Sequence, residues 1–302
     1  MEHSYIYALG YFDGVHLGHQ ALLSACRRAA REQSLRSGAV TFWGHPEATL
    51  TGRAPELINT ASDRNRLLCQ YVEQVVELPF DRELMCMPWR NFLRMLTEKH
   101  GARGFVCGAD FHFGKGSQGT APLLQAYCRQ MGLFCAVIDD QLLNGVRISS
   151  THIRKLLEDG DPEQAQRFLG HPHMLSGTVI HGKQLGRTIG FPTANMSYPD
   201  TLVRIPYGVY ATVAEVDGES CPAVTNLGVR PTVSGRGVTV ESFLTACSRE
   251  LYGKRMTLSF LKYLRPEEKF PDLYALQKQI QADARQAEAV GREFLSWQKR
   301  EE

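Results

Sequence analysis

The first half of the chain alternates short apolar runs with longer amphipathic stretches. The runs have the length and continuous apolar character of buried strands, and the amphipathic stretches carry apolar residues at helical spacing. The predicted strands span residues 5–9, 38–43, 72–78, 104–108 and 133–138, and the predicted helices span 20–28, 62–71, 88–100 and 121–131. This alternation predicts an α/β domain with a parallel sheet covered by helices on both faces.

The pattern changes near residue 170. A short helix is predicted to begin at an Asp161 cap, with Pro162 at its first position, and to end at Gly170. The strands predicted after it are short and separated by Gly, Pro and Asp turns, at residues 175–181, 208–216, 220–226, 238–245 and 255–264. They predict a small antiparallel β-barrel, and the apolar spacing after Asp272 predicts a long terminal helix. We therefore expect two domains, residues 1–170 and 171–302.

Residues 10–19 are unusually constrained, at the turn from the first predicted strand into the first helix. The glycines of this stretch are Gly10, Gly14 and Gly18, and between them lie Phe12, Asp13 and His16, with His19 at the end. A helix N-terminus offers unpaired N–H groups and partial positive charge, which suit a phosphate. His16 and His19 would share one face and donate to the phosphate oxygens. The alternative is a glycine-rich turn with capping or solvated histidines.

Two further loops follow predicted strands of the same sheet. Residues 108–119 contain four glycines, with Asp110 and His112 able to meet a sugar hydroxyl or phosphate. Phe111 and Phe113 could either pack against the sheet or stack on a ligand ring. Residues 147–154 open a helix with three hydroxyl side chains between two arginines, the pattern of an anion cradle, although one hydroxyl would suffice as a cap. The cradle residues are Arg147, Ser149, Ser150, Thr151 and Arg154.

The barrel half has its own dense motif at residues 182–195. Its glycines, together with a lysine and an arginine, predict a flexible basic flap that binds phosphate through Gly182, Lys183 and Gly186. The spacing of these residues is not that of a Walker A loop. Thr193 and Asn195 can offer oxygen ligands to a magnesium ion that bridges nucleotide phosphates. Glu241 is the candidate base for an acceptor hydroxyl, the alternative being a solvated strand glutamate.

Net charge, apolar runs and cysteine spacing exclude several classes of protein. The formal net charge is only +2, which argues against nucleic acid or an anionic membrane as a partner. No apolar run approaches the roughly 20 residues that span a bilayer, and the first residues lack the pattern of a signal peptide, so we expect a cytoplasmic protein. The eight cysteines form no C-x-x-C pair, and neither a zinc site nor a disulfide framework is expected.

Together these motifs resemble the bacterial bifunctional riboflavin kinase and FAD synthetase family over nearly the whole chain. Residues 10–19, 108–119 and 147–154 resemble the G-x-F-D-G-x-H-x-G-H, G-x-D-F-x-F-G and I-S-S-T-x-I-R motifs of the adenylyltransferase half. Residues 186–195 resemble the G-R-x-x-G-F-P-T-A-N motif of flavokinases. The resemblance implies a nucleotidylyltransferase-type, Rossmann-like sheet domain followed by a small barrel domain.

The resemblance also implies the chemistry. ATP would phosphorylate riboflavin to FMN, and a second ATP would adenylylate FMN to FAD with release of pyrophosphate, both with Mg²⁺. The adenylyl step would use His16 and His19 with the residue 149–154 cradle, and the kinase step would use Thr193 and Asn195 for the metal and Glu241 as base. Flavin contacts are expected at Asp110, Phe111, Phe113 and Arg265.

Three departures from the family pattern concern Tyr11, Gly44 and the run from Ser242 to Cys247. The altered run follows the candidate base directly. One alternative hypothesis is therefore that only FMN adenylyltransferase activity is fully retained, with a weakened kinase. Another is a flavin-binding or RNA-binding regulator on the same scaffold. We expect a monomer or weak self-association.

Overall fold

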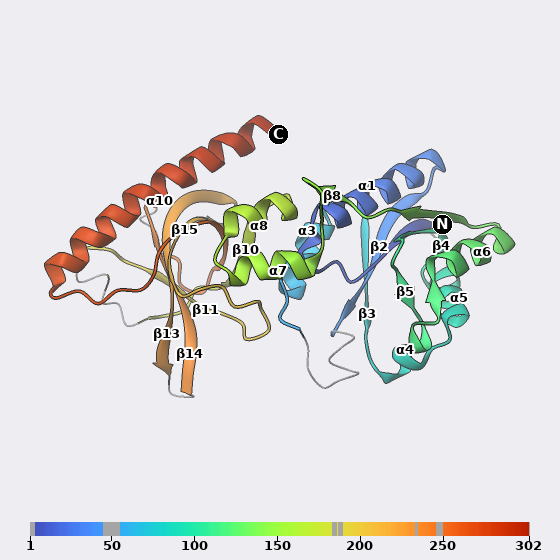
Figure 1. The fold of residues 1–302 in the computed structure, drawn as a ribbon, viewed down its shortest axis with the longest axis horizontal. Coiled ribbons are helices and arrows are strands. Elements are labelled where there is room, and N and C mark those ends of the chain that lie inside the picture. Colours follow the sequence, from blue (N-terminus) through green and yellow to red (C-terminus); the bar gives the residue numbers. More distant parts are fainter. Residues whose placement is uncertain are drawn as a thin grey trace. The chain divides into compact units, whose positions relative to one another are not determined.

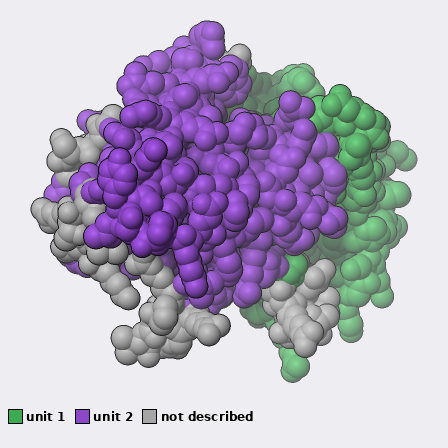
Figure 2. Space-filling view, turned by 60° about the vertical axis from the view of Figure 1, so that its left-hand side comes forward, with its two compact units in different colours: residues 1–55, 61–150 green, residues 56–60, 151–302 purple. Residues whose placement is uncertain are grey.

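The computed structural model describes residues 4–44, 55–182, 186, 190–232, 235–245 and 250–301. Its contacts divide the chain into two compact units, residues 1–55 with 61–150 and residues 56–60 with 151–302 (Figure 2). The division falls at the start of α7 (Ser150–Glu158), so α8 (Pro162–Leu169) also belongs to the second unit. The boundary expected at residue 170 separates the two functional domains, which a division by contacts does not test, so it stays a prediction.

The first unit contains a five-stranded parallel sheet, as predicted. Its strands are β1 (Tyr5–Leu9), β2 (Arg36–Trp43), β3 (Gln74–Pro79), β4 (Ala102–Gly108) and β7 (Phe134–Ile138), in the spatial order β3-β2-β1-β4-β7. The chain builds outward from β1 in one direction and then returns to add β4 and β7 on its other side. Ligands of such sheets bind beyond the carboxyl ends of the strands where this reversal occurs.

Helices cover both faces of this sheet (Figure 1). They are α1 (Leu17–Glu32), α3 (Ala61–Leu68), α4 (Arg82–Cys86), α5 (Trp89–Lys99) and α6 (Ala121–Met131). One face packs on α1, where the Cys26 thiol donates to the carbonyl oxygen of Ile6 at 3.1 Å. On the other face, Tyr7 and Leu9 join the apolar side chains of α5 and α6 in one core. The period of two along β1 thus supplies both layers.

Small elements absent from the sequence prediction shape the loops. They are the hairpins β5 (His112–Phe113) with β6 (Gly119–Thr120) and β8 (Leu142–Leu143) with β9 (Val146–Arg147), and the short turns η1 (Asp13–Val15) and η2 (Lys115–Ser117). Two-residue strands leave almost no periodic signal. Both predicted glycine-rich loops of this unit therefore contain defined local structure.

The second unit is built on a six-stranded antiparallel sheet. Its strands are β10 (His173–Thr178), β11 (Ala194–Ser197), β12 (Gly208–Val216), β13 (Glu219–Thr232), β14 (Gly235–Leu244) and β15 (Arg255–Arg265). The spatial order is β10-β15-β12-β13-β14-β11. A bridge between Ile180 and Asn195, with N–H to O at 2.8 Å, joins the two edges. The predicted barrel is confirmed.

The two faces of the barrel strands have different neighbours. A buried row of hydroxyls crosses three strands, with Thr225 Oγ1 at 2.8 Å from both Thr212 Oγ1 and Ser242 Oγ. The opposite face packs on α10 (Leu273–Glu301), which Asp272 caps by accepting a hydrogen bond from the Ala275 amide at 2.7 Å. The expected terminal helix and its cap are therefore confirmed. Among the described residues, no helix has both the length and the apolar character needed to cross a membrane.

Candidate active sites

The turn after β1 lies at the switch point of the parallel sheet and has an unusual backbone. Phe12, Gly14 and Val15 all have positive φ, at 60°, 82° and 39°. The Phe12 ring is buried, and a Cβ on Gly10 would lie only 3.1 Å from it. Two non-glycine residues in the left-handed region are costly, which marks this turn as a functional candidate. Phe12 was predicted to bind phosphate, but its buried ring packs beneath the backbone of the turn and supports it.

His16 and His19 lie together, as the sequence predicted, but in different roles. His16 is the N-cap of α1, and its Nδ1 accepts a hydrogen bond from the His19 amide at 3.3 Å. Because Nδ1 accepts, the proton of a neutral His16 ring is on Nε2. The two rings are stacked with centroids 3.6 Å apart, and a Cβ on Gly18 would lie 3.2 Å from the His16 ring. The capping interpretation is therefore confirmed for His16, and its phosphate contact stays a prediction.

The environment of His19 keeps its imidazole neutral. Burial lowers the pKa of His19 well below its usual 6.5, and the neighbouring His16 adds to the shift. Its Nδ1 is buried and has no hydrogen-bond partner in the described structure. The edge of the Phe12 ring packs against it at a centroid distance of 5.3 Å. His19 can therefore hydrogen-bond a phosphate oxygen through a neutral N–H rather than as a cation.

The predicted Ser-Ser-Thr cradle opens α7, and its members have separate partners. Ser150 Oγ donates to the backbone oxygen of Asp13 at 2.9 Å, which ties the start of α7 to the turn after β1. In the second unit, the Arg154 guanidinium donates to Thr151 Oγ1 at 3.4 Å and to the Glu56 carbonyl at 3.3 Å. The structure thus brings Asp13 and Ser150 together within the first unit.

Asp110 of the predicted acceptor loop is held by Arg147. The Arg147 guanidinium donates to Asp110 and also to Asp140 Oδ1, the latter at 2.9 Å. Both carboxylates raise the pKa of Arg147, and Asp110 has the larger effect. Phe111 and Phe113 stack on one another with centroids 5.3 Å apart. Phe113 is buried in the core, so packing against the sheet describes this ring, while Phe111 is partly exposed. Their flavin contacts stay predictions.

Sequence reasoning missed a buried cation at the same edge of the sheet. The guanidinium carbon of Arg64 lies 4.7 Å from the centre of the Tyr11 ring, and Arg64 donates to the carbonyl of Phe42 at 2.7 Å. Arg64 is only 2% exposed. The aromatic ring of Tyr11 was the available signal, because such a ring can cover a desolvated guanidinium.

The second unit contains a cavity of about 350 Å³, within the range of small-molecule sites. It is lined by Gly186, Phe191, Thr193, Val209, Val224, Asn226, Glu241, Phe243, Arg265, Glu267, Glu268, Phe270, Leu276, Ile280 and Asp283. Four of these were predicted from the sequence as site residues: Gly186, Thr193, Glu241 and Arg265. The structure therefore gathers most of the predicted kinase residues around one hollow.

Strand alternation explains how Glu241 reaches this cavity. Along β14, Glu241 and Phe243 line the cavity, whereas Ser242 between them faces the buried hydroxyl row. In register, Glu241 lies opposite Asn195 of β11 and Asn226 of β13. Ser242, one of the departures from the family pattern, therefore lies in the barrel interior and not in the cavity. Phe243 packs edge-to-face with Phe191, with ring centroids 5.2 Å apart.

The side chains beside Glu241 suit a hard cation. Asn195 Nδ2 donates to the Thr193 carbonyl at 3.2 Å and lies 3.5 Å from Thr193 Oγ1, so the amide and hydroxyl share one small space. A Cβ on Gly182 would lie 2.6 Å from the Asn195 amide, so this glycine leaves room for Asn195. Hydroxyl, amide and carboxylate oxygens are the donors that Mg²⁺ prefers. Lys183 and Arg187 lie outside the described residues.

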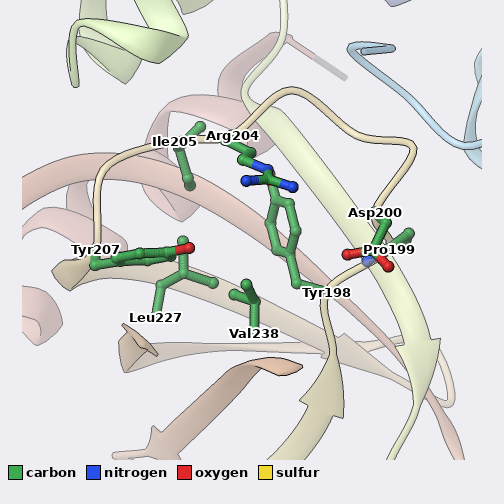
Figure 3. Close-up of a pocket in the computed structure, with 8 residues that line it drawn as sticks. All are labelled: Tyr198, Pro199, Asp200, Arg204, Ile205, Tyr207, Leu227 and Val238. Carbon is green, nitrogen blue, oxygen red and sulfur yellow. The ribbon is translucent and has the colours of Figure 1, made fainter. Parts of the chain in front are cut away.

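A metal cluster, or a second cavity of ligand size, in the described part of the second unit would be an alternative site. The described residues contain no group of three His, Cys, Asp or Glu side chains placed to hold a metal. A second hollow, between the loop of residues 198–207 and strands β13 and β14, measures about 10 Å³, which is room for about one water molecule (Figure 3). A flavin or a nucleotide is therefore too large for it.

One part of the cavity wall that sequence reasoning missed comes from the last helix. Leu276, Ile280 and Asp283 recur at helical spacing along α10 and line the cavity together. The spacing marks Leu276 and Ile280 as an apolar face in the sequence, but an apolar face does not show what it packs against. Asp283, a carboxylate on that same face, was the signal of a polar function.

Comparisons with known proteins match both units. The FAD synthetase family matches residues 1–152 and the riboflavin kinase family matches residues 169–290. Bifunctional riboflavin kinase/FMN adenylyltransferases from Pseudomonas fluorescens and Escherichia coli K12 are each 36% identical to this chain. The alignments cover 93% and 96% of this chain, and 91% and 92% of the relatives.

Further similarities agree with these. The corresponding Bacillus subtilis protein is 34% identical over 290 residues, covering 93% of this chain and 91% of that protein. A crystal structure of a Streptococcus pneumoniae protein described as a macrolide-efflux protein superimposes with a TM-score of 0.84 at 29% identity, covering 97% of this chain and 95% of the other. With two matching family regions and full-length relatives above 30% identity, the chain belongs to the bifunctional riboflavin kinase/FMN adenylyltransferase family.

Proposed function

We propose that the cavity of the second unit is the riboflavin kinase site and that the turn after β1 is the adenylyl-transfer site. As a member of its family, the protein is a riboflavin kinase and an FMN adenylyltransferase that uses ATP. Riboflavin, FMN and FAD are accordingly its substrates and products. The observation that carries the assignment of the kinase site is that one cavity contains Glu241, Thr193 and a largely aromatic and aliphatic lining.

In the kinase step, Glu241 accepts the proton of the ribityl 5′-hydroxyl as this oxygen attacks the terminal phosphorus of ATP, whose bond to the bridging oxygen breaks so that ADP leaves. Thr193 and Asn195 would hold Mg²⁺, and their hydroxyl and amide oxygens support this role. Bound Mg²⁺ would neutralise phosphate charge. The apolar side chains around the cavity, Phe191 and Phe243 among them, exclude water from the reacting groups and offer surfaces for a flat ring.

In the adenylyl step, the FMN phosphate oxygen attacks the α-phosphorus of ATP and pyrophosphate leaves. His16 Nε2, a neutral His19 N–H and the backbone at the N-terminus of α1 stabilise the charge that develops on the α-phosphate. Asp13 and Ser150 hold this turn against the start of α7. Gly14 permits its backbone, since the turn needs a φ of 82° at that position.

Two variants measured side by side test the assignment. Glu241→Gln should abolish conversion of riboflavin to FMN while FMN is still converted to FAD. His19→Ala should do the reverse, so that FMN accumulates when riboflavin is supplied. Glu250→Gln, which changes an exposed glutamate of the second unit, is the matched control and should retain both activities. If Glu241→Gln kept full kinase activity, or His19→Ala full adenylylation, the corresponding site would be wrongly placed.

The remaining features of the proposal concern the setting in which the enzyme works. We place it in the cytoplasm, where its ATP and flavin substrates are available, as a monomer or a weakly self-associating protein that does not bind nucleic acid. Light scattering during gel filtration, over a range of protein concentrations, measures the association directly. A stable oligomer at micromolar concentration would contradict it.

A further inference from the structure

Arg265 and Asp283 form a buried, forked ion pair in the wall of the kinase cavity. Arg265 Nε donates to Asp283 Oδ1 at 3.2 Å and to Oδ2 at 3.1 Å, and a terminal guanidinium nitrogen donates to Oδ2 at 2.7 Å. The side chains are only 16% and 6% exposed. Paired hydrogen bonds of this kind fix the plane of the guanidinium as well as its position.

Other contacts complete the pair on both sides. Gln279, one turn earlier on α10, donates to Asp283 Oδ1 at 2.8 Å. The remaining terminal nitrogen of Arg265 donates to the Pro266 carbonyl at 3.0 Å, and the guanidinium carbon lies 5.6 Å from the centre of the Phe270 ring. The pair therefore links the end of β15 to the middle of α10, and every nitrogen of the guanidinium is engaged.

The other carboxylates around the cavity would attract the Arg265 guanidinium if Asp283 did not hold it. Besides Asp283, three carboxylates line the same hollow: Glu241, Glu267 and Glu268. Burying an ion pair costs desolvation, and apolar side chains of the same shape stabilise a fold equally well, so stability alone does not require this pair. A guanidinium released from Asp283 would be drawn toward the other carboxylates and into the space that the substrate needs.

We propose that Asp283 is a positioning residue of the riboflavin kinase site. By holding Arg265 flat in the cavity wall, it keeps the flavin-binding space open and keeps the cation away from Glu241. It acts on riboflavin binding and not on the phosphoryl-transfer step, and Gln279 supports it. This inference rests on the assignment of the cavity as the kinase site.

Steady-state kinetics of FMN formation test this role. For Asp283→Asn, we expect the KM for riboflavin to rise about tenfold, which corresponds to about 1.4 kcal/mol of binding free energy, while kcat stays within about threefold. Asp283→Glu should recover part of the affinity, because a longer carboxylate can still reach the guanidinium. Conversion of FMN to FAD by the same preparation should be unchanged, because that step is assigned to the first unit, and the retained kcat of the kinase shows that the second unit is folded.

A milder variant keeps the test decisive if Asp283→Asn fails to fold. Gln279→Ala removes only the supporting hydrogen bond and should raise KM about two- to threefold, less than the full worth of such a bond because the Arg265–Asp283 pair itself remains. Gln281→Ala, at an exposed position two residues further along α10, is the matched control and should change nothing. An unchanged KM in Asp283→Asn and Gln279→Ala, or a loss of kcat at constant KM, would overturn the proposal. Failure of the site assignment itself would appear separately, as kinase activity that survives Glu241→Gln.

Discussion

The partly buried His19, at the start of α1, should make the first unit sensitive to acid. In the folded chain, burial and the adjacent His16 lower the pKa of His19 well below 6.5, the value expected for the unfolded chain. Below about pH 6.5, the unfolded chain therefore binds a proton at His19 that the folded chain does not bind. The free energy of unfolding should fall as the pH falls through this range, and a variant without an imidazole should lack this part of the loss.

The size of the effect follows from the proton-binding equilibrium. One pH unit below the unfolded pKa, proton binding at His19 of the unfolded chain lowers the free energy of unfolding by about 1.4 kcal/mol. One unit above that pKa, the loss is about 0.1 kcal/mol. Between about pH 7.5 and pH 5.5, the native protein should therefore lose about 1.3 kcal/mol more than His19→Gln. Only the difference in pH dependence is compared, since the substitution also changes the stability at every pH.

Urea unfolding followed by tryptophan fluorescence measures this difference. Of the three tryptophans, Trp43 and Trp89 lie in the first unit and Trp297 lies in the second. In a Trp297→Phe background, the fluorescence reports on the unit that contains His19. Parallel pH dependences of the native protein and His19→Gln would refute the reasoning, because His19 would then have an ordinary pKa in the folded chain.

Three further predictions concern the second unit and the metal. Gly182→Ala should lower kinase kcat/KM at least about tenfold, or about 1.4 kcal/mol, and leave adenylylation intact, because a Cβ there would lie 2.6 Å from the Asn195 amide; an active kinase would show that Asn195 can move without loss. Thr225→Val should cost about 1–3 kcal/mol of unfolding free energy in urea, because Thr212 and Ser242 lose a buried partner, and a smaller loss would mean that the two hydroxyls find new partners. Removal of divalent metal by a chelator should stop both reactions, as chromatography of the products would show, with recovery on added Mg²⁺; turnover in the chelator would contradict the assigned metal role.

The sequence predicted the fold where its patterns were long, and it failed where they were short. Strand β12 was predicted with its observed bounds, because nine residues of strand pattern lie between clear turns. Strand β11 was missed, because its four residues, Ala194–Ser197, follow a glycine-rich stretch and give almost no period. This strand carries Asn195 and closes the barrel through Ile180, so the closure depended on a contact that local pattern does not encode.

The site was predictable where a motif carries the chemistry and not where distant segments meet. His16, His19 and Glu241 stand in motifs; the structure places the two histidines at the carboxyl edge of the sheet and Glu241 in the cavity wall, and their catalytic roles stay predictions. The partnership of Arg265 with Asp283 joins residues 18 positions apart on a strand and a helix, and no spacing rule predicts it. The capping role of His16 was also open, because a side chain that caps a helix and one that faces a ligand have the same sequence signature.

The alternation along β14 makes the strand's register decide which side chain reaches the cavity assigned to the kinase. Glu241 lies in the cavity because it is paired with Asn195 and Asn226, while Ser242 lies in the buried hydroxyl row. A slip of one residue against either neighbour would exchange the two faces, placing a carboxylate in the barrel interior and a hydroxyl at the reacting oxygen. Insertions or deletions of a single residue within this strand should therefore abolish the kinase even when every side chain of the motif is retained, whereas changes in loop length outside it leave the pairing free to re-form.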